Sequence, residues 1–239
     1  MPKNFKFIYP FLLTLLLCTT LHAAPLKILS LDFTRELTEN NKTETLAGTL
    51  HFDVKTARVV VEVTEPLKQI MVVQDKVLEI YYPIENQAFR FIAKGRIPLP
   101  FVESIIQSTQ AEYGLTAIGY SLDRHEIAED VLYTHWTSPK KAKDKLGGII
   151  LGTRAGRLIS AEVKTSDGKL AAKSIYGNHA KLGGSYIPME VTSSLYGPKS
   201  EVLEYERVIY SNPHPNVQPP PSLLQFEIPE SAKVKEMEW

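Results

Sequence analysis

Three short segments resemble motifs that perform chemistry, and each lacks a residue that the chemistry requires. The first, His125-Glu126-Ile127-Ala128-Glu129, is close to the zinc-protease pattern His-Glu-x-x-His, but glutamate stands in place of the second histidine. Zinc binding by that pattern also needs a helix to place both histidines on one face, whereas the alternation here predicts a strand. We interpret the segment as a solvated, charged strand, and His51 and His135 as surface or packing residues.

The two glycine-containing segments fail in the same way. Gly152-Thr153-Arg154-Ala155-Gly156 has no serine for a nucleophile elbow, and Gly147-Gly148 precedes an apolar strand instead of Gly-Lys-Ser/Thr. No distinctive carboxylate pair stands out for glycoside chemistry. We therefore expect no enzyme, no catalytic residues, no cofactor and no metal ion. A cluster of Asp123, His125 and Glu126 around a cleft would support an enzyme instead.

Composition indicates an ordinary globular chain with no preference for polyanions. Of the 239 residues 44% are hydrophobic, which suits one domain or at most two. The 27 Lys and Arg residues balance 27 Asp and Glu residues, so the formal net charge is zero. A chain without a net field does not attract nucleic acid over long distances, and we expect no nucleic-acid partner.

Residues 1–24 have the layout of a secretory signal peptide. Two lysines precede an apolar run from Phe7 to Leu17, and small residues follow at Ala23 and Ala24. The run is shorter than the roughly 20 residues that span a bilayer. We expect cleavage near these alanines and a periplasmic mature protein formed by residues 25–239.

Cys18, the single cysteine, lies inside this predicted signal. A lipoprotein signal places a small residue before its cysteine, whereas Leu17 is bulky, so we do not expect lipidation at Cys18. The mature chain then has no disulfide, thiolate metal site or thiol nucleophile.

The rest of the chain alternates apolar and polar residues between short polar turns, which predicts antiparallel strands. The predicted strands are Ile28–Leu37, Thr43–Phe52, Arg58–Thr64, Gln69–Val73, Val77–Tyr82, Ala88–Ala93, Thr116–Leu122, His125–Thr137, Gly148–Thr153, Leu158–Thr165, Leu170–Tyr176, Ser185–Ser193, Glu201–Ser211 and Leu224–Ile228. Residues 213–221 are proline-rich and extended. After Pro98 and Pro100, helical spacing of apolar residues predicts one amphipathic helix before Gly114.

These elements predict a mainly β fold with a few helices (α+β), built on a large curved antiparallel sheet. Its concave face is filled by side chains and a helix, or by a ligand. Periodicity alone favours a packed core. A ligand would instead meet the apolar strand residues Phe33, Leu50, Val59, Val61, Val63, Val72, Leu78 and Ile80, covered by the helix residues Phe101, Ile105 and Ile106.

The order of several motifs resembles the outer-membrane lipoprotein carrier (LolA-like) family. The matching segments are Asp32-Phe33-Thr34, Ala47-Gly48-Thr49-Leu50, Gln74-Asp75-Lys76 before Tyr81-Tyr82-Pro83, Gln87-Ala88 and, more loosely, Phe226-Glu227-Ile228-Pro229. The resemblance implies a single domain forming an unclosed β-barrel with a helical lid. It further implies a monomer that holds the acyl chain of a lipid or lipoprotein, with membrane proteins of the envelope as donor and acceptor.

Two departures from the family pattern leave an alternative open. The family has a helix before the first strand, whereas a strand begins here almost at once. The family also ties its lid to the barrel with an arginine followed by proline, where this chain offers Lys55 or Arg58. The alternative is a non-enzymatic envelope scaffold or stress sensor that binds a protein partner, with its own side chains filling the trough.

Overall fold

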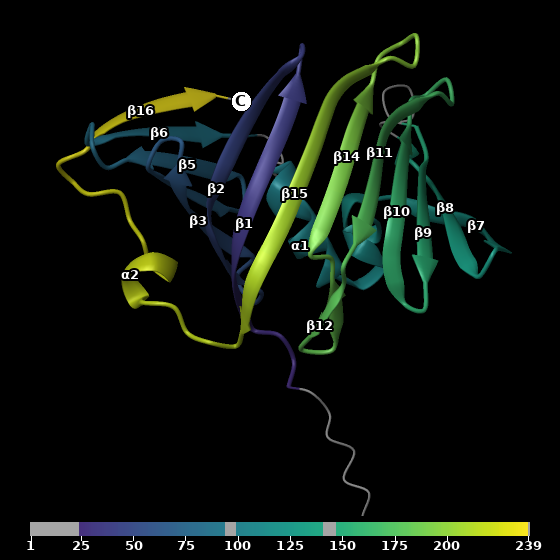
Figure 1. Cartoon of the computed structure of the whole chain (residues 1–239), viewed down its shortest axis with the longest axis horizontal. Helices are drawn as coiled ribbons and strands as arrows, with labels where there is room; N and C mark the ends of the chain where they lie inside the picture. The colour runs from purple at the N-terminus through teal and green to yellow at the C-terminus, as the bar shows by residue number, and fades with distance from the viewer. Residues whose placement is uncertain (1–23, 94–98, 141–146, 239) are drawn as a thin grey trace, which may run out of the picture.

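The computed structural model describes residues 24–93, 99–140 and 147–238 (Figure 1). Cys18 and the body of the predicted signal peptide lie outside the described residues. The strands are β1 (Ile28–Glu39), β2 (Lys42–Asp53), β3 (Arg58–Glu65), β4 (Gln69–Gln74), β5 (Val77–Tyr82), β6 (Gln87–Ile92), β7 (Ser121–Ala128), β8 (Val131–Thr137), β9 (Ile149–Arg154), β10 (Arg157–Lys164), β11 (Leu170–Gly177), β12 (Ala180–Leu182), β13 (Ser185–Ile187), β14 (Glu190–Tyr196), β15 (Val202–Pro215) and β16 (Lys233–Glu238). The helices are α1 (Pro100–Ser108) and α2 (Pro221–Leu224), with 3₁₀ turns at Ala111–Gly114 and Thr116–Ile118.

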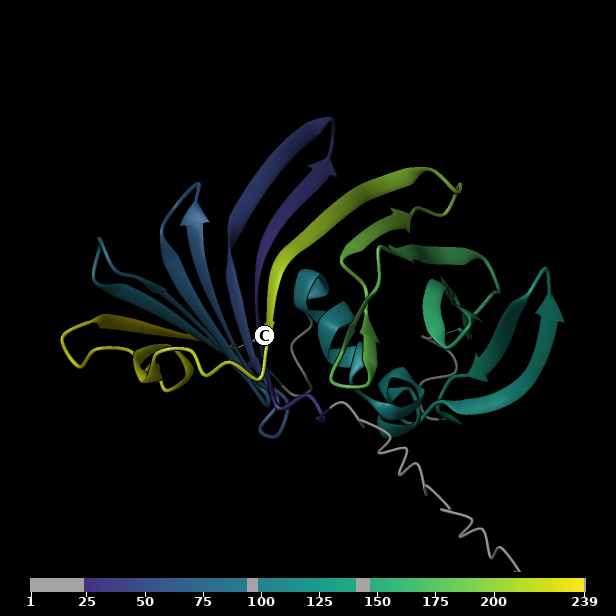
Figure 2. The same cartoon turned by 60° about the horizontal axis from the view of Figure 1, so that its bottom comes forward.

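Within the described residues, fourteen strands form one sheet in the order β16-β6-β5-β4-β3-β2-β1-β15-β14-β11-β10-β9-β8-β7. The sheet curves around α1 and does not close, because β16 and β7 remain as its two edges (Figure 2). Neighbouring strands are antiparallel except β16, which runs parallel to β6. The structure thus confirms the predicted mainly β fold and its large curved, unclosed sheet, with this one parallel pair added.

The pairing register places the apolar residues of successive strands on one face. Leu31 of β1 is opposite Leu50 of β2, which is opposite Val61 of β3. The long hairpin that fixes this register turns at Asn40 and Asn41, both with positive φ (50° and 59°). Asparagine tolerates this left-handed backbone better than other side chains do, so a tight turn fits there.

Helix α1 packs on the concave face of the sheet, against β1 and β15 (Figure 2). Phe101, Val102, Ile105 and Ile106 are all at most 4% exposed, as their helical spacing predicted. The Phe101 ring stacks on Phe33 of β1, with ring centres 5.3 Å apart. The helix ends at Ser108, earlier than Gly114, because the 3₁₀ turn that follows contains positive φ angles.

The C-terminal strap, which we define as residues 216–232, runs from β15 through α2 to β16 (Figure 1). It covers the convex face beside β3 and β5. The Arg58 guanidinium donates hydrogen bonds to the carbonyl oxygens of Leu224 (2.9 Å) and Phe226 (2.6 Å), and the Phe226 ring lies 5.8 Å from that of Tyr81. The prediction of a strand at Leu224–Ile228 is therefore wrong. Two carbonyl groups that would hydrogen-bond a neighbouring strand are bound by the Arg58 side chain instead.

Three further strand predictions need correction. The predicted strand at 116–122 starts with a 3₁₀ turn, and β7 begins only at Ser121. The single strand predicted for 125–137 is a hairpin, because Glu129 and Asp130 adopt positive φ angles of 50° and 62°. The single strand predicted for 185–193 is divided between β13, which pairs with β12, and β14, which joins the large sheet.

Candidate functional site

Most of the residues predicted to line a trough belong to the packed core, and Ile106 also borders a cavity. Phe33, Leu50, Val59, Val61, Val63, Leu78, Phe101, Ile105 and Ile106 belong to one buried cluster, and Ile80 packs against it. The concave face of β1–β3 is filled because α1 presses four apolar side chains onto it. The structure brings these residues together as predicted, but most of them face one another and not an open space.

Val72 is a correction, because it lies on the other face of the sheet. Its partners across the ladder are Val60 and Glu79, whereas Val59 and Leu78 are opposite Val73. Successive residues of a strand point to opposite faces, so an apolar run such as Met71-Val72-Val73 does not reveal which of its members face inward. Val73 takes the place that the sequence analysis gave to Val72.

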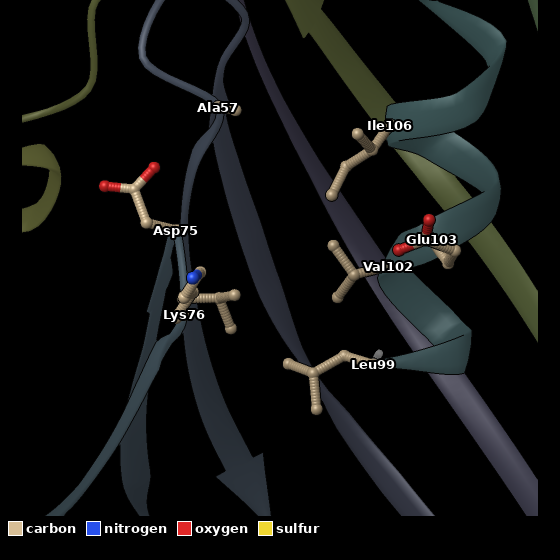
Figure 3. A pocket seen from close by; sticks show the side chains of 8 residues that line it. Ala57, Asp75, Lys76, Leu99, Val102, Glu103 and Ile106 are labelled. Atoms are coloured by element: carbon tan, nitrogen blue, oxygen red, sulfur yellow. The ribbon is translucent and has the colours of Figure 1, made fainter. Parts of the chain in front are cut away.

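Open space remains on both flanks of α1. The first space, the β4-side cavity, is about 320 Å³ and lies between α1 and the β4–β5 turn (Figure 3). Val102 and Ile106 of α1, together with Leu99 just before the helix, point toward the strands across this gap (Figure 3). The other lining residues are Ala57, Val73, Asp75, Lys76 and Glu103.

The second space, the β10-side cavity, is about 280 Å³ and lies between α1 and the C-terminal half of the sheet. Its apolar walls are Leu115, Ile149, Leu151, Leu158, Ala161, Val163, Ala172 and Val191, and its polar lining groups are Glu103, Ser104, Gln107, Tyr113, Ser174, Tyr176 and Ser193. None of the residues predicted as ligand contacts lines this cavity.

A row of small side chains explains why this half is hollow. Ala161 of β10 is opposite Ser174 of β11, and Ser174 is opposite Ser193 of β14. The hydroxyl oxygens of the two serines lie 2.9 Å apart and hydrogen-bond each other. Because the two hydroxyl groups already hydrogen-bond each other, they can lie beside an apolar ligand without losing a hydrogen bond. These small residues are far apart in the sequence and form a row only through the pairing of β10, β11 and β14.

Tyrosines stand at the polar side of the β10-side cavity. Burial raises the pKa of the Tyr176 phenol, and burial also raises the pKa of the Tyr113 phenol. Both side chains are therefore neutral hydrogen-bonding groups near pH 7. Gln107 donates a hydrogen bond to the Glu103 carboxylate over 3.1 Å. The lining thus combines hydrocarbon walls with neutral polar groups and one carboxylate.

The side chain that ties α1 to the sheet is Arg35 of β1, which the sequence analysis did not single out. Its guanidinium lies 5.6 Å from the centre of the Phe101 ring and pairs with buried Glu206 of β15 over 2.5 Å. Tyr210 of β15 adds hydrogen bonds to the Phe101 carbonyl and to Ser104. Of the two cations considered from sequence, Arg58 holds the C-terminal strap and Lys55 is exposed in the β2–β3 turn.

The residues considered for an enzyme do not form a cluster. His125 and Glu126 are consecutive in β7 and therefore lie on opposite faces. Glu126 lies 3.4 Å from His135 on the convex face, where both are beside a small surface pocket. Among the described residues, no group of three or more His, Cys, Asp or Glu side chains is arranged to hold a metal ion. No described helix is long and apolar enough to cross a bilayer.

Comparison with solved structures identifies the fold. A LolA superfamily protein from Nitrosomonas europaea aligns with a TM-score of 0.55 and 16% identity over 84% of this chain and 92% of its own. A DUF1329 family protein from Desulfovibrio piger aligns with a TM-score of 0.61 and 14% identity, over 82% of this chain and 89% of its own. A putative outer membrane lipoprotein-sorting protein domain from Vibrio parahaemolyticus aligns with a TM-score of 0.57 and 9% identity, over 82% of this chain and 88% of its own.

These structures show that the chain has a LolA-like fold, as its motif order predicted. No protein-family model matches the sequence. No curated protein matches it either.

Proposed function

We propose that this chain is a non-enzymatic periplasmic carrier that shelters an acyl chain of a lipid or lipoprotein in the β10-side cavity. The observation that carries the proposal is the hollow beside α1, where a row of small side chains leaves apolar walls uncovered. The fold supports it as well, since one solved structure with this fold is described as a lipoprotein-sorting domain. The signal-peptide layout of residues 1–24 supports the compartment.

The size and chemistry of the cavity fit part of one hydrocarbon chain. Ligand pockets usually hold about 300–1,000 Å³, and this one, at about 280 Å³, is near the lower end. Removing hydrocarbon from water stabilises a complex by about 0.8 kcal/mol per CH₂. A segment of about eight carbons would therefore gain roughly 6 kcal/mol before the losses of ordering are subtracted.

A matched pair of adjacent alanines on β11 tests the proposal. Ala172 lines the cavity, while its neighbour Ala171 is not among the lining residues. We expect Ala172→Trp to weaken binding of a fluorescent fatty acid at least 10-fold and Ala171→Trp to leave the affinity within 2-fold. Native mass spectrometry of the exported protein should show a co-purified lipid on the wild type and on Ala171→Trp.

Equal binding by the two variants, or no uptake of any acyl ligand by the wild type, would contradict the proposal. A dry cavity together with a stable protein partner in a pull-down would favour the scaffold alternative. Circular dichroism and thermal unfolding of each variant separate loss of the site from loss of the fold.

A further inference from the structure

Helix α1 divides the space on the concave face, and one residue faces both parts. Leu99, Val102 and Ile106 line the β4-side cavity, Ser104 and Gln107 line the β10-side cavity, and Glu103 lines both. Helical residues are about 100° apart around the axis. Glu103 therefore lies roughly opposite the midpoint of Phe101 and Ile105, which face the sheet. It occupies the crest of α1, between the two cavities.

We propose that the ligand is a two-chained lipid that straddles α1, with one chain in each cavity and its polar head at Glu103. This inference rests on the proposed function and names the ligand class that the site takes. A lipid with a glycerol-like branch point has two chains that diverge from one head group. The helix crest and the two flanking cavities have the same branched shape.

The anchoring of α1 explains why the chains pass on both sides of it. Phe101 and Ile105 are at most 4% exposed, and the Tyr210 hydroxyl and the Arg35 guanidinium bind the same helix face. Displacing the helix would expose this packed surface. Cavities of about 320 and 280 Å³ are each too small for two chains, so one chain in each is the arrangement that leaves α1 in place.

Linking the two chains also strengthens binding. Once the first chain is inserted, the second is held near its cavity at a high effective concentration. A two-chained lipid should therefore bind more tightly than a single-chained lipid with chains of the same length. The protein should take up one two-chained lipid, or two single-chained ones.

The head-group contacts at the crest are hydrogen-bond acceptors. The Glu103 carboxylate accepts a hydrogen bond from Gln107, and the oxygens of an ionised carboxylate act only as acceptors. The head group that fits there carries donors, either a hydroxyl or an ammonium group. Lys76 and Asp75 at the edge of the β4-side cavity add one charge of each sign.

Binding measurements with matched lipids test the chain number. Dioctanoylglycerol should bind the full-length mature protein at least 10-fold more tightly than monooctanoylglycerol by isothermal titration calorimetry. Native mass spectrometry should show one diacyl or two monoacyl ligands per protein. Equal affinities, or a single monoacyl ligand at saturation, would overturn the two-chain arrangement and leave the proposed function standing. Failure of both lipids to bind would count against the proposed function itself.

Blocking each cavity separately provides the second test. Val73→Trp fills the β4-side cavity and Ala172→Trp fills the β10-side cavity, with Val202→Trp and Ala171→Trp as controls outside the cavities. Each cavity variant should reduce dioctanoylglycerol affinity to the monoacyl level and retain one monoacyl ligand. If Val73→Trp binds the diacyl lipid like Val202→Trp, then the second chain does not use the β4-side cavity and the proposal fails.

Glu103→Gln tests the position of the head group and distinguishes its two forms. Phosphatidylethanolamine with octanoyl chains should lose 3- to 10-fold in affinity if its ammonium group contacts the carboxylate. Dioctanoylglycerol should lose a similar factor if a hydroxyl group is the partner. If neither lipid binds Glu103→Gln more weakly than the wild type, the head group does not lie at the crest.

Discussion

The two halves of the concave face share one helix, but their strands carry side chains of different size. Large apolar side chains fill the rows of β1–β3 and leave a cavity only at the β4–β5 turn, whereas small side chains leave a hollow along β10, β11 and β14. In the N-terminal half, Leu50, Val61 and Met71 follow one another across β2, β3 and β4. In the C-terminal half, the corresponding row across β9, β10, β11 and β14 runs from Leu151 through Ala161 and Ser174 to Ser193. Side-chain volume at paired positions therefore sets how much space remains between α1 and each row.

The convex face shows the same division. In the N-terminal half the C-terminal strap covers Val60 and Val72, which are 0% and 3% exposed. The C-terminal half has no such cover among the described residues, and Ile175 and Ile209 on that face are 46% and 38% exposed. The N-terminal half is therefore buried on both faces, whereas the C-terminal half is buried only on the concave face that α1 covers.

The largest expected effect comes from truncating one leucine in each half. Leu50→Ala should lower the free energy of unfolding by about 3–5 kcal/mol, because Leu50 is fully buried and its removal leaves a void. Leu151→Ala should cost only about 2 kcal/mol, because Leu151 already borders a cavity and has fewer neighbours to lose. Urea unfolding monitored by circular dichroism measures both. Equal losses would contradict the difference in packing between the two halves.

Enlarging a side chain should change the free energy of unfolding in opposite directions in the two halves. Val61→Leu inserts a methylene into the filled half and should destabilise the protein by about 1–3 kcal/mol. Ala172→Val fills part of the β10-side cavity and should stabilise the ligand-free protein by about 0.5–1 kcal/mol. The midpoints of urea unfolding give the sign of each change in stability, with Ala171→Val as the control outside the cavity. Destabilisation by Ala172→Val would mean that this cavity is already tightly packed.

Most of the fold was predictable because alternation reports directly on strands. The period-2 runs located β1–β6, and the spacing of Phe101, Val102, Ile105 and Ile106 located α1. Some failures were local, such as the turn at Glu129 and Asp130, and others occurred where backbone conformation depends on distant groups. Arg58 binds the strap carbonyls from about 166 positions away in sequence, and no local pattern reveals that contact. The parallel pairing of β16 with β6 is likewise a contact between distant segments.

The site was harder to predict because the sequence signal was misread. Large apolar residues were predicted as the lining of a hollow, but most of them pack against one another, and only Ile106 borders either cavity beside α1. Ala161, Ser174 and Ser193 are the informative residues, and they become a row only once the register of three strands is known. Periodicity gives the face of each residue within a strand, but it does not give the register between strands.

The smallest expected effect is a difference in acid sensitivity between the halves. His51 of the filled half is 5% exposed, hydrogen-bonds Ser30 over 2.8 Å and lies 3.5 Å from Glu62. Burial lowers the pKa of His51, and Glu62 only partly opposes this. His179, in the turn between β11 and β12 in the hollow half, donates a hydrogen bond from Nε2 to the Leu158 carbonyl oxygen over 2.7 Å, and burial lowers its pKa too.

Because the pKa of His51 is lower in the folded state, the unfolded state binds more protons as the solution becomes acidic. The stabilisation is fully present above the unfolded pKa of about 6.5 and is lost as pH falls toward the folded value, by at most about 1.4 kcal/mol per pH unit for one proton. Urea unfolding of His51→Gln between pH 7.5 and 5 should therefore show a flatter decline than the wild type. His179→Gln should flatten it less, because His179 is more exposed and its environment is less closely packed. If His179→Gln reduced the pH dependence of the free energy of unfolding more than His51→Gln did, the more tightly packed histidine would be the one in the hollow half. That result would contradict the expected order of the two halves.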